Sequence, residues 1–240
     1  MIIFAHILRD NNKRNIIIMS NKTHSDAPIA ADEVLSKSEA LILKYKNIII
    51  AAIAAVVIIM VGSMAYNTYV AEPQEKEAAE AMYIAESLFA AQDFEKAIDG
   101  DGVNLGFLQI ADEYGSTAAG NLAHAYAGMA LAQLGRYEEA IDELEAFDAD
   151  DQIVAPAAMG TLGSCYAQTG DADAAAKYFV EAAEMADNNS LSPFYLFQAG
   201  NIYEQQGNSS KALKLYEQIK NDYSTSSFAT DIDKYINRVK

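Results

Sequence analysis

The chain contains very little cysteine, proline, histidine or tryptophan. Its 240 residues include one cysteine, four prolines, three histidines and no tryptophan. Because Cys165 is alone, no disulfide can form within the chain, and no cysteine near the apolar segment described below offers a lipid attachment site. We expect Cys165 to be a small buried apolar residue, the alternative being a reactive or intermolecular thiol.

The scarcity of proline and the lack of strand periodicity favour helix. Proline interrupts helices, and a half-buried strand would alternate apolar and polar residues with a period of two. No segment alternates in this way for long enough to predict a strand, and 51% of the residues are hydrophobic. The sequence therefore predicts a folded, all-α chain.

Residues that carry out catalysis or bind metals do not cluster. His6, His24 and His124 lie in three separate regions, and no histidine or cysteine stands at ligand spacing from His124. The segment Asp99–Gly102 resembles a calcium loop only faintly, and a turn is the better interpretation. No glycine-rich phosphate loop follows a strand. We predict no catalytic residue, no metal, no cofactor and no small-molecule substrate, so an enzyme is the least favoured class.

Basic residues are outnumbered two to one, and the imbalance lies in one part of the chain. The 17 Lys and Arg residues face 34 Asp and Glu residues, a net charge of −17. Residues 1–71 have a net charge of +2, and residues 72–240 have a net charge of −19. This acidity argues against nucleic acid and anionic lipid surfaces as partners of the second part. It suits basic or apolar protein partners, although solubility alone is a sufficient reason for it.

One continuous apolar segment lies near the amino terminus. Residues 47–71 carry no charge, and residues 48–65 are almost wholly apolar. As a helix, the apolar residues 48–65 would span about 27 Å, close to the thickness of a bilayer core. We predict a transmembrane helix over residues 47–70, with a buried core helix as the alternative. The segment begins too late for a cleaved signal peptide, and Tyr66 and Tyr69 suit a membrane–water interface.

The flanking charges predict the orientation of this helix. Lys37, Lys44 and Lys46 precede it, whereas Lys76 is the only base among the first 15 residues that follow. By the positive-inside rule the amino-terminal side is cytoplasmic. The prediction is a single-pass protein of a cell inner membrane, whose carboxyl-terminal domain would be periplasmic in a bacterium.

Three segments follow from this prediction: a cytoplasmic tail of residues 1–46, the transmembrane helix and a periplasmic domain of residues 71–240. Within the tail, Met19 is followed by Ser, Asn and Lys and reads like a natural start. Our hypothesis is that translation begins at Met19 and that residues 1–18 are absent from the native protein.

The second part repeats one pattern of small and large residues. Successive copies begin 35 and 37 residues apart, a period typical of stacked helical hairpins. The copies are Gly128, Leu131, Gly135, Tyr137, Ala140, Leu144; Gly163, Tyr166, Gly170, Ala172, Ala175, Phe179; and Gly200, Tyr203, Gly207, Ser209, Ala212, Tyr216.

Each position of the pattern has a physical role. The first glycine lies inside a helix, where it costs about 1 kcal/mol relative to alanine, so we expect it to permit a close helix crossing. The second glycine is expected to end that helix in the left-handed conformation. The alanine and the large residue four positions later lie on one face of the second helix and fill the space between hairpins.

Weaker signals extend the repeat in both directions. Ala85, Leu88, Gln92, Phe94 and Ala97 follow the same template 43 residues before the first full copy. This spacing is longer than the other two, and we expect the extra residues to form a break at Asp99–Gly102. A helix over residues 104–114 is expected after the break. Residues 226–239 are expected to form a helix that caps the last apolar face.

These residues resemble the tetratricopeptide family, whose L-G-x-x-Y element is complete in Leu162-Gly163-x-x-Tyr166. The family's usual Trp is replaced by His124, Met159 and Leu196, and its late Pro is missing. The resemblance implies a solenoid whose first helices line a groove that binds proteins or peptides. The residues carried over to that groove are Leu122, Ala125, Met129, Gln133, Ser164, Gln168, Phe194, Phe197, Asn201 and Gln205.

The predicted groove contains no Lys or Arg, and only Asn201 is compatible with the family's carboxylate clamp. That mechanism is therefore disfavoured, and an amphipathic helix or an extended apolar segment is the expected ligand. Phe194 and Phe197 either line the groove or pack against the capping helix.

The plan of the chain, with one anchor, an acidic repeat domain and a degenerate first repeat, resembles the YfgM-like ancillary subunits of the SecYEG translocon. The resemblance implies a non-catalytic adaptor that passes emerging clients to periplasmic chaperones. The alternative is an envelope scaffold for cell division or outer-membrane assembly.

Overall fold

The computed structural model describes residues 29–148 and 151–240, and every regular element in those ranges is helical. The prediction of an all-α chain is confirmed, whereas residues 1–18 and the proposed start at Met19 lie outside the described residues. The elements in order are α1 (Ile29–Tyr66), the π-helix η1 (Asn67–Ala71), α2 (Glu72–Ala90), α3 (Phe94–Asp99), α4 (Phe107–Glu113), α5 (Ala118–Gln133), α6 (Tyr137–Ala146), α7 (Val154–Thr169), α8 (Ala172–Ala186), α9 (Ser192–Gln205), α10 (Ser209–Asp222), the 3-10 helix η2 (Phe228–Thr230) and α11 (Ile232–Val239).

The chain divides into two units, Met1–Val61 and Gly62–Lys240. In the first unit the described residues form helix α1, and its side chains from Leu43 to Val61 are exposed. Among the described residues there is one helix long and apolar enough to cross a membrane, and none of its most apolar window is buried. The helix therefore has the length and composition that a membrane span requires.

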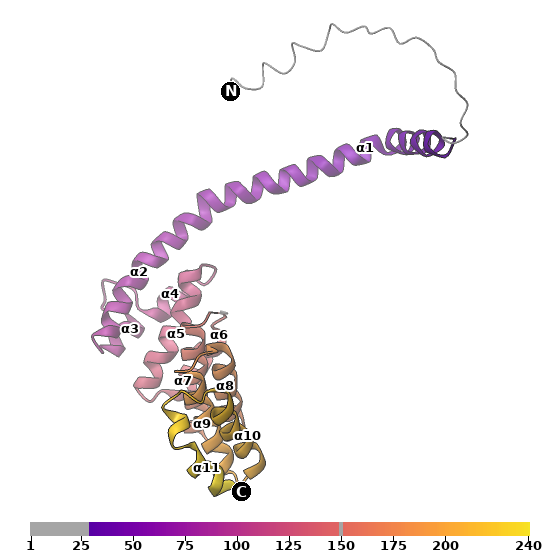
Figure 1. Cartoon of the computed structure of the whole chain (residues 1–240). Coiled ribbons are helices and arrows are strands. Elements are labelled where there is room, and N and C mark those ends of the chain that lie inside the picture. Colours follow the sequence, from indigo (N-terminus) through magenta and orange to yellow (C-terminus); the bar gives the residue numbers. More distant parts are fainter. Residues whose placement is uncertain (1–28, 149–150) are drawn as a thin grey trace. The chain divides into compact units, whose positions relative to one another are not determined.

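From α2 onward the second unit is a series of antiparallel helical hairpins (Figure 1). Helices α5 and α6, α7 and α8, and α9 and α10 form three hairpins, and each packs against the next. At the three turns Gly135, Gly170 and Gly207 have φ angles of 76°, 92° and 75°. A residue with a Cβ rarely adopts this left-handed conformation, so the predicted role of the second glycine is confirmed.

The first glycine of each copy lies where two helices cross. A Cβ on Gly128 would overlap Leu144, and one on Gly200 would overlap the ring of Tyr216. At Gly163 a Cβ would lie 3.2 Å from both the carbonyl oxygen of Ala175 and the ring of Phe179, a tighter fit than usual. The close crossing predicted from the sequence is therefore confirmed in all three hairpins.

The degenerate first copy also forms a hairpin, made of α2 and α3. Gln92 occupies the place of the turn glycine and has a φ of 62°. Helix α3 has only 6 residues and ends at Gly100, which has a φ of 85°. The repeat register therefore holds one unit further toward the amino terminus than the three full copies.

The helix predicted over residues 104–114 begins later, at Phe107. The Asp101 carboxylate accepts hydrogen bonds from the backbone N–H of Val103 and of Asn104, at 2.9 and 2.7 Å, and these bonds hold the preceding residues in a turn. The same bonds lower the pKa of Asp101 to about 2. A Cβ on Gly106 would overlap the backbone of Ile98, so the start of α4 packs closely against α3 there.

The predicted carboxyl-terminal cap is present in two pieces. The segment begins with η2 and continues as α11, whereas a single helix from residue 226 was expected. The hydroxyl of Ser226 accepts a hydrogen bond from the N–H of Ala229, at 3.2 Å, which favours the short first turn. Ile232, Ile236 and Val239 are buried against the last hairpin, so α11 covers its apolar face.

The core of the second unit follows the stacking of the hairpins. Three groups of buried residues lie in succession along the chain. They are centred on Phe107 and Ile110, on Leu131, Leu144 and Leu162, and on Leu196, Tyr216 and Ile219. This division is typical of a solenoid, in which each repeat contacts only its neighbours.

Candidate functional site

The first helix of each hairpin, α2, α5, α7 and α9, contributes side chains to what we call the groove face. The structure brings four of the ten predicted groove residues around one hollow of about 400 Å³, here called the central hollow. Those four are Gln133, Ser164, Gln168 and Phe194. The remaining lining residues are Ala132, Tyr137, Ala157, Gly160, Thr161, Cys165, Phe179 and Tyr195.

The central hollow combines amides, hydroxyls and aromatic rings. No Lys, Arg, Asp or Glu is among the described residues that line it. Gln133 and Gln168 are exposed, and Phe194 retains 37% of its surface. Side-chain amides can pair with the peptide groups of a bound segment, and an exposed ring offers it apolar contact. The surface therefore suits a neutral stretch of polypeptide.

The floor of this hollow depends on close packing. A Cβ on Gly160 would overlap the ring of Tyr195, so glycine lets that ring pack directly over α7. The Ser164 hydroxyl donates to the carbonyl oxygen of Gly160 at 2.9 Å, and the Thr161 hydroxyl donates to that of Ala157 at 2.8 Å. Both hydroxyls bond within their own helix and keep their acceptor lone pairs for another group.

Cys165 lies in the floor of the central hollow with no exposed surface. Burial raises the pKa of its thiol to about 11. Because the thiolate is the reactive form of cysteine, Cys165 is a buried apolar residue, as predicted.

Three predicted groove residues on α5 lie elsewhere. Ala125 is completely buried and belongs to the core, so it has no surface to offer a partner. Met129 is half-buried and packs against the same core cluster. Leu122 is also half-buried and lines a second hollow on the groove face.

This second hollow, here called the amino-terminal hollow, measures about 390 Å³ and lies between α2 and α5. It is lined by Glu75, Ala79, Met82, Tyr83, Glu86, Ala118, Ala119 and Leu122. Sequence reasoning missed it, although the register of the degenerate copy already places Ala79, Met82 and Glu86 at groove positions. The predicted groove rests on the three full copies and therefore does not include this hollow.

Phe197 belongs to the capping contact. Its ring centroid lies 4.7 Å from that of Tyr235 in α11 and 5.6 Å from that of Phe228 in η2. Of the two alternatives, packing against the cap therefore holds for Phe197. Phe194 takes part in both, because it lines the central hollow and its ring centroid is 6.0 Å from that of Phe228.

Gln205 is exposed near the end of α9. Asn201, on the same helix, is part of a hydrogen-bond network that joins α9, α10 and α11. The buried hydroxyl of Tyr216 lies 3.0 Å from both Asn201 Oδ1 and Glu204 Oε2, and Arg238 pairs with Glu204. Burial and the bond to Glu204 raise the pKa of Tyr216. Asn201 therefore has a structural partner inside the domain.

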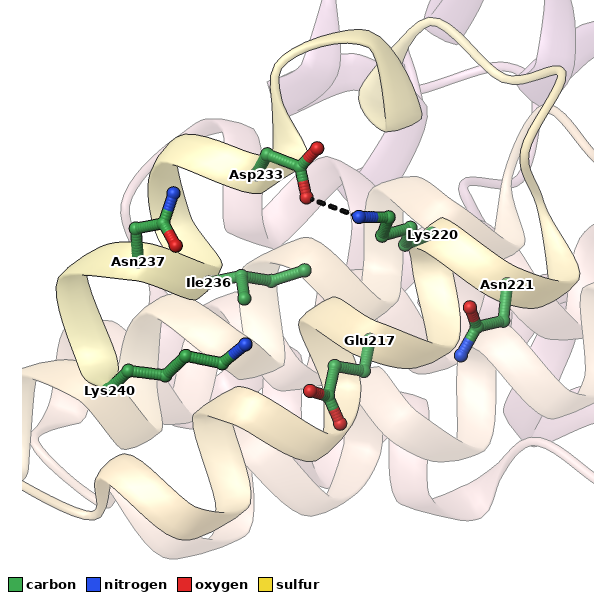
Figure 2. Close-up of a pocket in the computed structure, with 7 residues that line it drawn as sticks. All are labelled: Glu217, Lys220, Asn221, Asp233, Ile236, Asn237 and Lys240. Carbon is green, nitrogen blue, oxygen red and sulfur yellow. Dashed lines mark hydrogen bonds and ion pairs between the residues drawn. The ribbon is translucent and has the colours of Figure 1, made fainter.

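A third hollow, of about 460 Å³, lies between α10 and α11 and contains none of the predicted groove residues (Figure 2). Its lining is polar, and the ammonium of Lys220 lies 2.7 Å from the Asp233 carboxylate. The residues drawn around it are Glu217, Lys220, Asn221, Asp233, Ile236, Asn237 and Lys240. Without an exposed ring, it offers a partner less apolar surface than the groove face.

Among the described residues, the single histidine is paired with a carboxylate. His124 Nδ1 lies 2.7 Å from Glu143 Oε2, which joins α5 to α6 at the position where the family usually has Trp. Among the described residues, no group of three or more His, Cys, Asp or Glu side chains could hold a metal ion.

Comparison with known proteins agrees with this geometry. Residues 154–222, which contain α7 to α10, match the family model described as tetratricopeptide repeat. This segment of the chain carries tetratricopeptide repeats. The solved structure of the MamA protein is similar in fold, with a TM-score of 0.50 and 17% identity, and the match covers 68% of this chain and 89% of that chain. A search of the curated proteins finds no match.

Tetratricopeptide repeats are typical of scaffolds for interactions between proteins. The two repeats in the matched segment include the full L-G-x-x-Y element, whereas the first two hairpins depart further from the family pattern. The amino-terminal hollow lies in this more divergent part of the domain.

Proposed function

We propose that this protein is a membrane-anchored adaptor that binds segments of other proteins on its groove face. The observation that carries the proposal is the central hollow. It is neutral, rich in amides and aromatic rings, and lined by residues from three successive hairpins. Such a lining binds polypeptide by hydrogen bonds to its backbone and by apolar contact with its side chains.

The anchor in this proposal is the transmembrane helix of residues 47–70. The basic residues that precede it support a cytoplasmic amino-terminal tail of residues 1–46, and residues 71–240 then lie in the periplasm. An anchor keeps the groove at a membrane surface, where it raises the effective concentration of the groove beside any client that emerges there.

We infer that the clients are segments leaving the Sec translocon and that the protein passes them to periplasmic chaperones. The plan of the chain supports this, since an acidic repeat domain follows a single inside-to-outside anchor. The neutral central hollow suits unfolded segments of varied sequence, because its lining can contact peptide groups and apolar side chains and contains no charged residue that would select one charge.

The proposal is tested by crosslinking in cells. A photo-crosslinking amino acid replaces Gln168, on the groove face, and in a matched control it replaces Lys177, which is exposed on α8. We expect translocon subunits, chaperones or nascent clients to be captured from position 168 and not from position 177. Equal capture from both positions would exclude the groove as the binding surface. Capture of division or outer-membrane assembly proteins alone would assign the scaffold to that machinery.

A further inference from the structure

The amino-terminal and central hollows are the same site built twice, two repeats apart. We number each repeat so that its helix-crossing glycine, or Ala85 in the first copy, is position 8. In each hollow, the residues at positions 2, 5, 6 and 9 of one first helix form the wall, and the residue at position 2 of the first helix in the next repeat closes it. The equivalent pairs are Ala79 and Ala157, Met82 and Gly160, Tyr83 and Thr161, Glu86 and Ser164, and Leu122 and Phe194.

The chemistry of the two hollows differs where the pairs differ. At position 9 the amino-terminal hollow has the Glu86 carboxylate where the central hollow has Ser164. At position 6 it has Tyr83, which is 75% exposed, where the central hollow has Thr161. No Lys or Arg is among the described residues that line the amino-terminal hollow.

The second carboxylate of this hollow, Glu75, already has partners. It accepts hydrogen bonds from the backbone N–H groups of Ala118 and Ala119, at 2.7 and 3.0 Å, and so caps the start of α5. Glu86 has no ion pair with another described residue. Its charge is therefore the one that a ligand in this hollow would meet first.

We propose that the groove face binds one extended peptide segment that carries a lysine or arginine in the amino-terminal hollow and an apolar side chain in the central hollow. The cation would lie between the Glu86 carboxylate and the face of Tyr83, and its aliphatic stem would lie against Met82. The proposal rests on the proposed function and specifies the chemistry of the partner.

The spacing of the hollows sets the length of this segment. Adjacent packed helices lie about 8–10 Å apart, so two repeats separate the hollows by roughly 20 Å. An extended chain covers about 3.3 Å per residue, so the basic and apolar side chains would stand about six residues apart. A helical segment would need roughly twice as many residues, since its rise is about 1.5 Å per residue.

The charge of the whole domain agrees with this assignment. Residues 72–240 carry a net charge of −19, which attracts a basic segment from a distance and repels an acidic one. The selection is opposite to that of a carboxylate clamp, in which basic groove residues grip acidic tails. A basic residue flanked by apolar ones therefore fits both the local and the overall charge.

The test is a selection from a library of random ten-residue peptides displayed on phage, with the full-length protein held in mild detergent. We expect selected peptides to be enriched in Lys or Arg at one position and in apolar residues about six positions away. For Glu86→Gln the basic enrichment should disappear while the apolar enrichment remains. Glu217→Gln, which removes a carboxylate from the third hollow, is the matched control and should select the same peptides as the unchanged protein.

The best peptide is then measured by fluorescence anisotropy. We expect binding about tenfold weaker for Glu86→Gln and for Tyr83→Ala, and unchanged for Glu217→Gln. Unchanged melting temperatures show that the variants are folded. Apolar enrichment without basic enrichment would overturn this inference and leave the proposed function intact. Absence of any enrichment would overturn the inference, and the crosslinking experiment then decides the proposed function separately.

Discussion

At the scale of single residues, the turns within the hairpins all require a left-handed residue, and one of them lacks glycine. Gln92 has a φ of 62°, close to the angles of Gly135 and Gly207. A left-handed conformation costs a residue with a Cβ roughly 1–2 kcal/mol. The first hairpin therefore contains local strain that the other three avoid.

Replacing Gln92 with glycine should stabilise the domain. The relief of strain exceeds the entropy that glycine adds to the unfolded chain, so we expect a gain of about 0.5–1 kcal/mol in the free energy of unfolding. Chemical denaturation of the full chain in detergent, followed by circular dichroism, measures it. Gly170→Ala is the reciprocal control and should destabilise, and a loss of stability in Gln92→Gly would contradict the strain argument.

The helix-crossing glycines should differ in their tolerance of a methyl group. A Cβ on Gly200 would overlap the ring of Tyr216, which is completely buried and hydrogen-bonded, so we expect Gly200→Ala to destabilise by about 1–3 kcal/mol. Gly163→Ala meets its neighbours at 3.2 Å and should cost less. Thermal unfolding of the two variants ranks them, and the reverse order would show that the ring moves aside.

Asp101 should make stability depend on pH in a defined range. Hydrogen bonds from Asn104 and Val103 lower its pKa to about 2, from an ordinary value of 3.8. Because the pKa is lower in the folded state, the carboxylate stabilises the fold above about pH 4 and loses that contribution as the pH falls toward 2. We expect Asp101→Ala to melt at a lower temperature than the unchanged protein at pH 6, with the difference vanishing near pH 2. A difference that persists at pH 2 would have another cause.

At the scale of elements, periodicity predicted the hairpins well and their ends less well. The repeat register located four hairpins, including the one with Gln92 at its turn, because packing positions recur along the chain. It misplaced the starts of α4 and α11, where hydrogen bonds from Asp101 and Ser226 to the backbone decide the local conformation. Such bonds depend on one side chain each and leave no periodic signal.

The candidate site was predicted in part for a similar reason. The family register indicates which way a side chain on a first helix points, and it correctly brought Gln133, Ser164, Gln168 and Phe194 together. It does not indicate how deeply neighbouring repeats cover a small residue. Ala125 has a groove position in the family register and is nevertheless buried in the core.

The capping contact gives a prediction for two phenylalanines on one helix. Phe197→Ala removes a ring that packs against η2, α10 and α11, so we expect a loss of about 3 kcal/mol in stability. Phe194→Ala should cost less, because that ring is more exposed, and should weaken crosslinking from the groove instead. Denaturation and crosslinking of both variants separate the two roles, and equal losses of stability would contradict this division.

At the scale of the whole molecule, the described chain contains a helix suited to a membrane and a domain of stacked helical hairpins. The proposed topology is tested with cysteines introduced one at a time, in place of Lys37 and of Glu217. Cys165 itself contributes little background, because it is buried and its pKa is raised to about 11. In intact spheroplasts, a membrane-impermeant maleimide should label the cysteine at position 217 and reach position 37 only after permeabilisation. Labelling of both positions before permeabilisation would exclude this topology.

The cap that Glu75 places on α5 has a consequence for how the domain opens. The amides of Ala118 and Ala119 donate to a carboxylate that belongs to the preceding hairpin. Whenever that hairpin detaches, these two amides lose their acceptor and exchange their hydrogen with solvent. The hydrogen-exchange rates of the Ala118 and Ala119 amides therefore report how often the amino-terminal hairpin separates from the rest of the solenoid.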